Sequence, residues 1–202
     1  MTVIAHNVAT QPRRAHTRCR STPLSALAIS RLTRRGSRSG QQPVLERLAR
    51  HGLVLVQPAG AANLYRLNRQ HLLAGAVLAG AGARQELLTR LRAMLAGWSV
   101  PATHACLFGS VARDDAGPDS DIDVLLVRPQ ELDPDDPAWQ QQVRALEDAV
   151  FSWTGNALEV LETTPADLAR AADAGEPIVA AWREDSIQLV GDPLTGLLTA
   201  RT

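Results

Sequence analysis

Lysine is absent from this sequence of 202 residues, whose 21 basic residues are all arginine. Aromatic residues make up only 3% of the chain, and there are two cysteines, Cys19 and Cys106. Because these cysteines lie far apart and show no metal-ligand spacing, they indicate neither a disulfide framework nor a zinc site. Aliphatic residues are nevertheless plentiful enough for a packed core, in one large domain or two small ones.

A long hydrophobic run is also missing. The longest stretch of apolar and small residues, Leu72–Ala83, is shorter than the roughly 20 residues that a membrane-spanning helix needs. The first 20 residues are polar and contain arginine, without the apolar segment of a secretory signal. We therefore expect a cytoplasmic protein.

The formal net charge of zero conceals an uneven distribution. Residues 1–100 contain 15 arginines and 2 acidic residues, whereas residues 101–202 contain 6 arginines and 19 acidic residues. The two halves therefore carry charges of +13 and −13, which indicates two functional parts. The basic half is a candidate for binding nucleic acid, and the acidic half would bind a polyanion poorly unless metal ions intervened.

The basic half begins with residues 1–22, which lack periodicity and which we interpret as a disordered basic arm or as an unstructured start of the chain. Apolar spacing then predicts a helix over Ser25–Thr33, a turn at RGSRSG and a second helix along QQPVLERLARHG that ends in a glycine. Two strands, Leu53–Gln57 and Leu64–Leu67, predict a β-hairpin joined by Pro58–Asn63.

Helix, turn, helix and hairpin over residues 23–70 resemble the winged helix-turn-helix family. The resemblance implies that the start of the second helix approaches base edges of DNA, and that nearby arginines contact phosphates. The residues in the first role are Arg38, Ser39, Gln41 and Gln42, and those in the second are Arg34, Arg35 and Arg66. Pro43 lies in the first turns of this helix and predicts a late start or a bend. The alternative is a winged helix used only for protein contacts.

Residues 71–98 predict one or two connecting helices with an apolar leucine-rich face towards their end. Glycines at positions 75, 80 and 82 are unfavourable inside a helix. We therefore expect a break near them, which would form a hinge between the two parts of the chain.

The acidic half contains the stretch LFGSVARDDAGPDSDIDVLL, residues 107–126. A short apolar strand delivers the chain to Gly109 and Ser110, where glycine allows a ligand to approach the backbone and the amides that follow could bind an anion. A second strand over Asp121–Val127 directs Asp121 and Asp123 to one face. Two adjacent carboxylates need compensation, and Mg²⁺ binds few carboxylates together with substrate phosphates. The stretch therefore predicts a site for a nucleoside triphosphate with Mg²⁺, in which two ions roughly 4 Å apart would clamp the reacting phosphorus; the alternative is a solvated turn.

This stretch resembles the signature of the DNA polymerase β-type nucleotidyltransferase superfamily, and residues 100 to about 165 resemble its minimal nucleotidyltransferase type. The resemblance implies that Gly109 and Ser110 hold the β- and γ-phosphates and that Asp121 and Asp123 ligate Mg²⁺. It also implies a third carboxylate on a later strand. Glu159, on the strand expected over Ala157–Thr163, fills that position, where the family more often has Asp.

Glu159 would deprotonate the attacking group or hold the metal that does so; the alternative is a surface strand residue. Glu162 is the fallback, although strand alternation points it to the opposite face. Arg113 could reach a phosphate, or it could form an ion pair with Asp114 or Asp115.

The remainder of the acidic half predicts a long helix over Asp133–Gly155, two further helices, and a closing strand at SIQLVG. Thr164 is expected to cap the first of those two helices, and Trp182 is expected at a solvated helix end. We therefore expect an α+β protein with a winged helix-turn-helix over residues 23–70 and a nucleotidyltransferase fold with a mixed sheet over residues 99–202.

Two functions remain open. The first is an Mg²⁺-dependent nucleotidyltransferase that moves a nucleoside monophosphate, from ATP by preference, to a hydroxyl of a protein or small molecule. Some minimal relatives modify a partner toxin of the HEPN type, so a toxin–antitoxin role with DNA-binding autoregulation is implied, and a homodimer would suit a palindromic operator. The second is a winged-helix transcriptional regulator whose nucleotidyltransferase-like part senses nucleotide or is inactive.

Overall fold

The structure is a computed structural model that describes residues 22–33, 38–117 and 120–199. The chain divides into two compact units, residues 1–84 and 85–202. Among the described residues, no helix is both long and apolar enough to cross a membrane.

The described part of the first unit consists of short strands, two helices and the beginning of a third helix. Its elements are β1 (Leu24–Ser25), α2 (Ala26–Thr33), α3 (Arg38–Arg50), β2 (Val54–Ala59) and β3 (Ala62–Leu67). The three strands form an antiparallel sheet in the order β1-β3-β2. The order of helix, helix and hairpin is the one expected from the sequence.

Helix ends in this unit follow local sequence signals. The Ser25 hydroxyl accepts a hydrogen bond from the Ala28 amide at 3.2 Å, so it caps α2. At the end of α3, Gly52 has a φ of +73°, and the amides of Gly52 and Leu53 donate to the carbonyls of Ala49 and Leu48. This pair of bonds is the Schellman arrangement that stops a helix at a glycine.

Two features of the first unit differ from what the sequence indicated. α3 already begins at Arg38 and continues through Pro43, so the proline does not delay its start. The expected hairpin loop at Pro58–Asn63 is shorter, because Pro58 pairs with Asn63 and Ala59 pairs with Ala62. Pro58 is tolerated there because β2 is an edge strand, and Gly60, with a φ of +59°, makes the tight turn.

The core of the first unit lies between the helices and the sheet. Ile29 of α2 and Leu45 of α3 pack against Val54 and Tyr65 of the hairpin. A second cluster joins Leu53 and Leu67 to Ala74. The hairpin is thus fixed on the two helices by apolar contacts.

A single helix, α4 (Ala74–Ala96), follows. It runs without interruption through Gly75, Gly80 and Gly82, so the expected break is wrong. A Cβ atom at any of these glycines would meet nothing within 4 Å, which shows that no close packing interrupts the helix there. The boundary between the two units falls between Arg84 and Gln85, inside this helix.

The second unit is a mixed sheet covered by helices on both faces. Its elements after α4 are β4 (His104–Phe108), α5 (Gly109–Ala112), β5 (Ile122–Val127), α6 (Pro137–Thr154), β6 (Leu158–Thr163), α7 (Pro165–Asp173), α8 (Pro177–Asp185), β7 (Ile187–Gly191) and α9 (Leu194–Leu197). The strand order is β6-β5-β4-β7. β5 and β6 are parallel, and the other neighbouring pairs are antiparallel.

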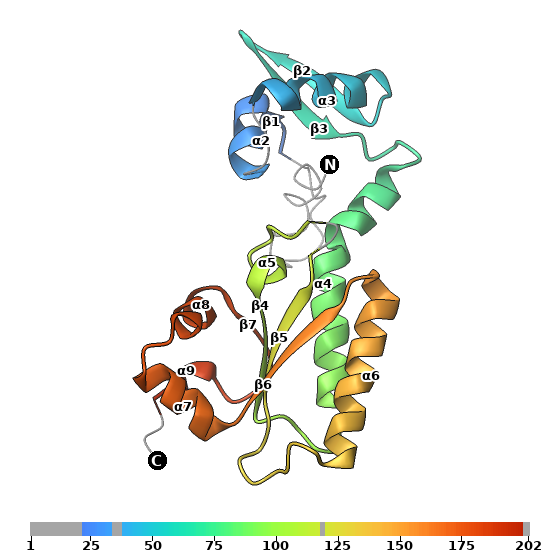
Figure 1. Ribbon diagram of the computed structural model, residues 1–202. Helices are drawn as coiled ribbons and strands as arrows, with labels where there is room; N and C mark the ends of the chain where they lie inside the picture. The colour runs from blue at the N-terminus through green and yellow to red at the C-terminus, as the bar shows by residue number, and fades with distance from the viewer. Residues whose placement is uncertain (1–21, 34–37, 118–119, 200–202) are drawn as a thin grey trace, which may run out of the picture. The chain divides into compact units, whose positions relative to one another are not determined.

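Each face of this sheet packs against a separate core. Successive residues of a strand point to opposite faces and therefore enter the two cores alternately. Val124 and Leu126 face the cluster formed with α6 and the end of α4, whereas Leu125 and Val127 face the cluster formed with α7, α8 and α9. Figure 1 shows α6 on one side of the sheet and α7, α8 and α9 on the other. A sheet buried on both faces explains the continuous apolar run at the end of β5, residues 124–127.

The helices of this unit confirm most of the expected pattern. Thr164 caps α7 through the Asp167 amide, as expected. α6 begins at Pro137, later than the expected Asp133, and Asp136 caps it by accepting hydrogen bonds from the amides of Ala138 and Trp139. Trp182 differs from expectation, because it is only 4% exposed and belongs to the core beneath α8. Its polar and charged neighbours in the sequence concealed its orientation.

Candidate active site

The candidate site lies where β4 passes into α5. Phe108, the last residue of β4, is extended, and Gly109 has a φ of +71°. This left-handed conformation favours glycine over every other residue. The chain therefore turns sharply at the end of the strand, and Ser110 follows in the first turn of α5.

Asp123 of β5 lies directly against this turn. A Cβ atom placed on Gly109 would fall 2.1 Å from Oδ2 of Asp123 and 2.8 Å from its Cγ, distances that only a missing side chain permits. Phe108 is the register partner of Asp123 across the antiparallel β4–β5 pair. The sequence predicted that the glycine-serine turn and this aspartate would converge, and the structure brings them into contact.

The third carboxylate position comes from the parallel pairing of β5 and β6. Glu159 is the register partner of Asp123, and partners directly opposite in a sheet project to the same face. Glu159 is exposed, whereas Asp123 is partly buried. The sheet register therefore places Phe108, Asp123 and Glu159 side by side on three neighbouring strands.

Asp121, Asp123 and Glu159 form a group of neighbouring carboxylates, and this proximity disfavours a negative charge on Asp123. Burial is the main cause that raises the pKa of Asp123 above its ordinary value, and the charges of Asp121 and Glu159 raise it further. Arg113 acts in the opposite direction and lowers the pKa of the same carboxyl. Like charges gathered in this way favour an incoming cation.

Arg113 pairs with two carboxylates. Its Nε lies 3.3 Å from Oδ2 of Asp115, and its Nη1 lies 3.7 Å from Oδ2 of Asp185. The pair with Asp115 is one of the two ion pairs that the sequence offered as an alternative to phosphate contact. The pair with Asp185, which comes from α8, had no signal in the sequence.

A residue that the sequence analysis missed fixes the start of β5. The side-chain amide of Asn156 donates a hydrogen bond to the carbonyl of Ser120 at 3.0 Å, directly before Asp121. The Ser120 hydroxyl in turn accepts from the amide of Gly117 at 2.8 Å. Asparagine is common in turns, so its position next to the helix-ending glycine did not predict a hydrogen bond to a different loop.

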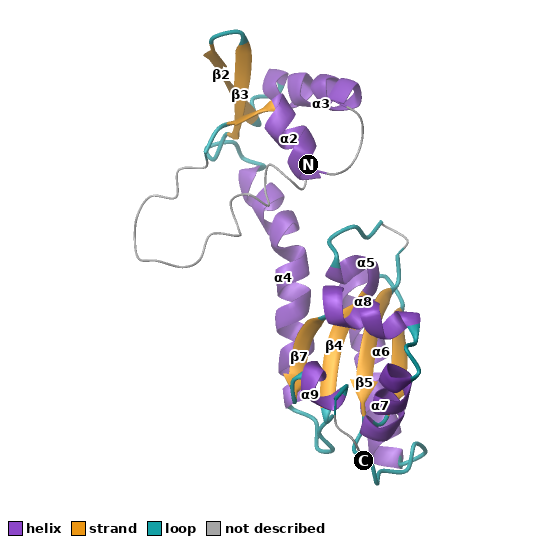
Figure 2. Ribbon diagram, turned by 90° about the vertical axis from the view of Figure 1, so that its left-hand side faces the viewer, coloured by secondary structure: helices purple, strands orange, loops and turns teal. Residues whose placement is uncertain are grey.

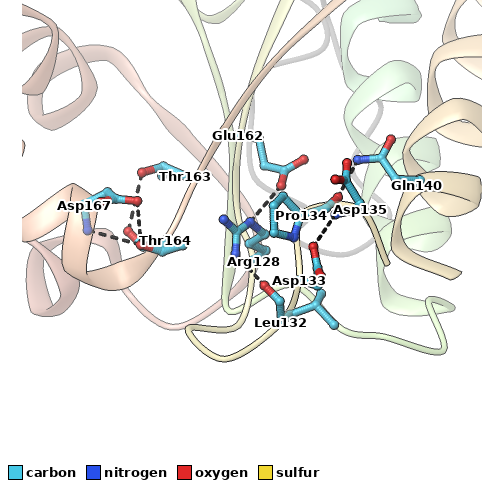
Figure 3. A network of polar contacts seen from close by, with 10 residues as sticks. All are labelled: Arg128, Leu132, Asp133, Pro134, Asp135, Gln140, Glu162, Thr163, Thr164 and Asp167. Carbon is cyan, nitrogen blue, oxygen red and sulfur yellow. Dashed lines mark hydrogen bonds and ion pairs between the residues drawn. The ribbon is translucent and has the colours of Figure 1, made fainter. Parts of the chain in front are cut away.

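Glu162 is not part of the site. Its Oε1 lies 2.9 Å from Nε of Arg128, and its register partner is Leu126, which faces the α6 side of the sheet. Figure 3 shows Glu162 in a separate polar network, with Arg128 also donating to the carbonyl of Leu132 at 2.6 Å. The predicted opposite orientation of Glu159 and Glu162 is confirmed.

The described carboxylates provide few protein ligands for a metal ion. Within residues 22–33, 38–117 and 120–199, no group of three or more His, Cys, Asp or Glu side chains could hold a metal ion. Mg²⁺ needs only one or two carboxylates when substrate phosphates supply further oxygens. The pKa of Asp123 is raised by burial first and then by the charges of Asp121 and Glu159, so a cation bound beside this carboxyl would relieve repulsion.

The residues predicted to contact DNA are only partly described. Arg34 and Arg35 lie outside the described residues, as do the side chains of Arg38 and Ser39. Gln42 makes two side-chain hydrogen bonds. Its amide donates to Oε1 of Glu46 at 2.9 Å and to the Tyr65 hydroxyl at 3.3 Å. Gln41 is partly buried, and Arg66 on β3 is exposed.

Comparison with known families finds a match between residues 87–161 and the nucleotidyltransferase domain family. This match supports a nucleotidyl transfer function for the second unit. A comparison with curated proteins found no match. A solved structure of a toxin–antitoxin with AMP-PNP is 14% identical, with a TM-score of 0.37, and the alignment covers 55% of this chain and 80% of that one.

Proposed function

We propose that the protein is an Mg²⁺-dependent nucleotidyltransferase that moves a nucleoside monophosphate from a nucleoside triphosphate, by preference ATP, to a hydroxyl of an acceptor. The observation that carries the proposal is the contact between Gly109 and Asp123, inside a segment that matches the nucleotidyltransferase domain family. The turn at Gly109 has no side chain, so a triphosphate can approach its backbone. The neighbouring carboxylates of Asp121 and Asp123 offer an adjacent position for the cation of that triphosphate.

Each residue of the site has a distinct role in this proposal. Gly109 and Ser110 bind the β- and γ-phosphates through the backbone turn and the hydroxyl. Glu159 accepts the proton of the attacking hydroxyl, a contribution that typically accelerates a reaction by about 10² to 10⁴. Asp121 and Asp123 would hold Mg²⁺, which when bound would neutralise charge on the triphosphate and on the leaving pyrophosphate.

We place the acceptor hydroxyl on a protein, with a small molecule as the second choice. Residues 85–202 contain 8 arginines and 20 acidic residues, a net charge of −12. Such a surface repels a long nucleic acid, whose binding depends on basic residues. A partner toxin of the HEPN type is the protein acceptor that the resemblance to minimal nucleotidyltransferases suggests.

The first unit supplies DNA binding in this proposal, as a winged helix that acts in autoregulation, with a homodimer on a palindromic operator. Residues 1–84 contain 13 arginines and one acidic residue, Glu46. The exposed Arg66 on β3 is suited to a phosphate contact, which positions a protein on DNA without reading its sequence.

The test is transfer of label from α-³²P-ATP to the protein itself or to the product of an adjacent gene, together with release of pyrophosphate. Asp121→Asn and Asp123→Asn should each abolish labelling. Asp135→Asn is the matched control, because Asp135 is an exposed aspartate on the loop before α6 and should leave labelling unchanged. Labelling that persists in both site variants would reject the proposed active site.

A second candidate function is a winged-helix transcriptional regulator whose second unit binds nucleotide without transferring it. The observation in its favour is the charge of residues 1–84, whose 13 arginines and single acidic residue suit the binding of DNA phosphates. Nucleotide-dependent change in DNA affinity, with no pyrophosphate released under any condition, would favour this regulator over the enzyme.

A further inference from the structure

Arg113 connects the site to a helix that is distant in the sequence. It directly follows α5, and its guanidinium is shared between Asp115, in the same loop, and Asp185, the last residue of α8. The side chain of Asp185 is 29% exposed, and that of Arg113 is 42% exposed. This ion pair is therefore accessible to a ligand that enters from solvent.

A second contact fixes α8 beside the site. The ring of Trp182, one turn before Asp185, meets the ring of Phe108 edge to face, with 6.1 Å between their centroids. Phe108 directly precedes Gly109 and is the register partner of Asp123. Figure 2 shows α8 next to α5 at the same end of the sheet. Asp185 thus occupies a defined position relative to the carboxylate row.

The pairing of Arg113 has a consequence for any phosphate that binds there. A guanidinium binds phosphate strongly through paired N–H groups. Here Asp185 already forms an ion pair with Arg113 and so competes with a phosphate for it. Ion pairs as exposed as this one contribute little stability, so a phosphate can replace Asp185 at a small cost. Breaking the pair between Arg113 and Asp185 nevertheless subtracts this cost from the free energy of phosphate binding.

We propose that Asp185 is a positioning residue that holds Arg113 while the site is free of nucleotide, and that a triphosphate must displace it from Arg113. Asp185 thereby lowers the affinity of the site for nucleotide and favours release of the charged product. The inference rests on the proposed function, because it assigns a regulator of affinity to the same site.

The test compares MgATP binding by calorimetry at about 0.15 M salt in the full-length protein and its variants. Asp185→Asn should lower the Kd about two- to fivefold, the range that corresponds to an exposed ion pair, and Asp185→Glu should restore the wild-type value. Glu184→Gln removes an exposed charge from the adjacent position of the same helix and should change the Kd much less. In the background of Arg113→Ala, Asp185→Asn should have no effect.

Three results would overturn this inference. They are a Kd that is unchanged or higher in Asp185→Asn, a decrease of the same size in Glu184→Gln, and a decrease that persists without Arg113. Tryptophan fluorescence during urea unfolding shows whether each variant is folded, because all four tryptophans lie in residues 85–202. Absence of MgATP binding in the wild type is a different outcome, since it rejects the proposed function together with this inference.

Discussion

The carboxylate of Asp123 occupies the space that a side chain on Gly109 would fill, since a Cβ there would lie 2.1 Å from Oδ2. Two independent restrictions thus meet at one glycine, the positive φ of +71° and the contact with a carboxylate. The glycine is required by its surroundings as well as by its own backbone.

Gly109→Ala should therefore cost more than an ordinary substitution at a positive φ, which costs about 1–2 kcal/mol. Gly155→Ala is the matched control, because Gly155 has a φ of +76° and nothing within 4 Å of its Cβ position. Urea unfolding followed by tryptophan fluorescence measures both. Transfer activity should fall at least about 100-fold in Gly109→Ala, as expected when reacting groups are displaced by about 1 Å, and remain in Gly155→Ala. Equal losses of stability in the two variants would show that the Asp123 contact has no energetic effect.

Glu159→Gln and Glu162→Gln should separate catalysis from stability. Loss of the general base at position 159 should reduce transfer by about 10² to 10⁴, with little change in unfolding. Glu162→Gln removes the partner of Arg128, whose side chain is 16% exposed, and should destabilise the protein by about 1–3 kcal/mol while activity per folded molecule is retained. Initial rates of pyrophosphate release, measured beside urea unfolding, check both. The reverse pattern would move the third carboxylate to Glu162.

Asn156→Ala should impair the site through the backbone that it holds. The hydrogen bond to the Ser120 carbonyl positions the residue before Asp121, so we expect transfer to fall about tenfold, because small displacements of catalytic groups are costly. The stability should fall by about 1 kcal/mol.

Gln142→Ala is the control for that variant. Gln142 also holds a loop by its side chain, accepting from the amides of Ser99 and Val100 at 2.8 and 3.1 Å, but that loop lies before β4. We expect a similar loss of stability with unchanged transfer. Equal activity in the Asn156→Ala and Gln142→Ala variants would assign Asn156 a structural role alone.

The buried His104 should make the second unit sensitive to mild acid. His104 is 1% exposed, and its Nδ1 lies 2.6 Å from the carbonyl oxygen of Asp192. Burial lowers its pKa below the ordinary value of 6.5. As the pH falls below 6.5, the unfolded imidazole binds a proton that the folded one does not. The free energy of unfolding should therefore decrease as the pH falls towards the folded pKa, by at most about 1.4 kcal/mol per pH unit.

His104→Gln should flatten this dependence between about pH 5 and the ordinary histidine pKa, above the range in which most carboxylates titrate. His51→Gln, at an exposed histidine of the first unit, should leave it unchanged. The measurement is urea unfolding by tryptophan fluorescence across that pH range. An unaltered slope in His104→Gln would assign the acid sensitivity to other groups.

DNA binding by the first unit should depend on salt and on Arg66. If Arg66 contacts a phosphate, Arg66→Gln should weaken binding to all duplexes equally and reduce the slope of log K against log salt concentration by about one. Arg144→Gln, at an exposed arginine on α6, should affect neither quantity. Fluorescence anisotropy with a labelled duplex at several salt concentrations measures both. A wild-type protein without affinity for duplex DNA at low salt would reject the DNA-binding proposal.

Elements with strong local signals could be predicted from the sequence. β5, α6 and the helix cap at Thr164 follow from apolar runs, prolines at helix starts and a capping side chain. The Gly109–Asp123 contact could be anticipated because strand alternation and the spacing of the signature limit where the chain can turn. These predictions depend on residues that are close in the sequence.

Contacts between distant segments could not be predicted. The pair of Arg113 with Asp185 joins positions 72 residues apart, and nothing in the sequence around Asp185 points to Arg113. Trp182 is buried by the packing of α8 on β4, which no periodicity in a short helix reveals. The glycines of α4 gave a false signal for a break, because helix propensity per residue is a weak term that the rest of a 23-residue helix outweighs.

The uninterrupted course of α4 limits how this protein can be dissected. Leu91 and Leu95 are almost completely buried in the core of the second unit, although they precede the first strand of its sheet. A fragment that starts at β4 would lack α4 and would therefore expose the apolar sheet residues that α4 buries. Such an exposed apolar surface would tend to aggregate. Dividing the protein for separate study therefore means cutting a helix in the middle, near Arg84, and giving the new end a cap.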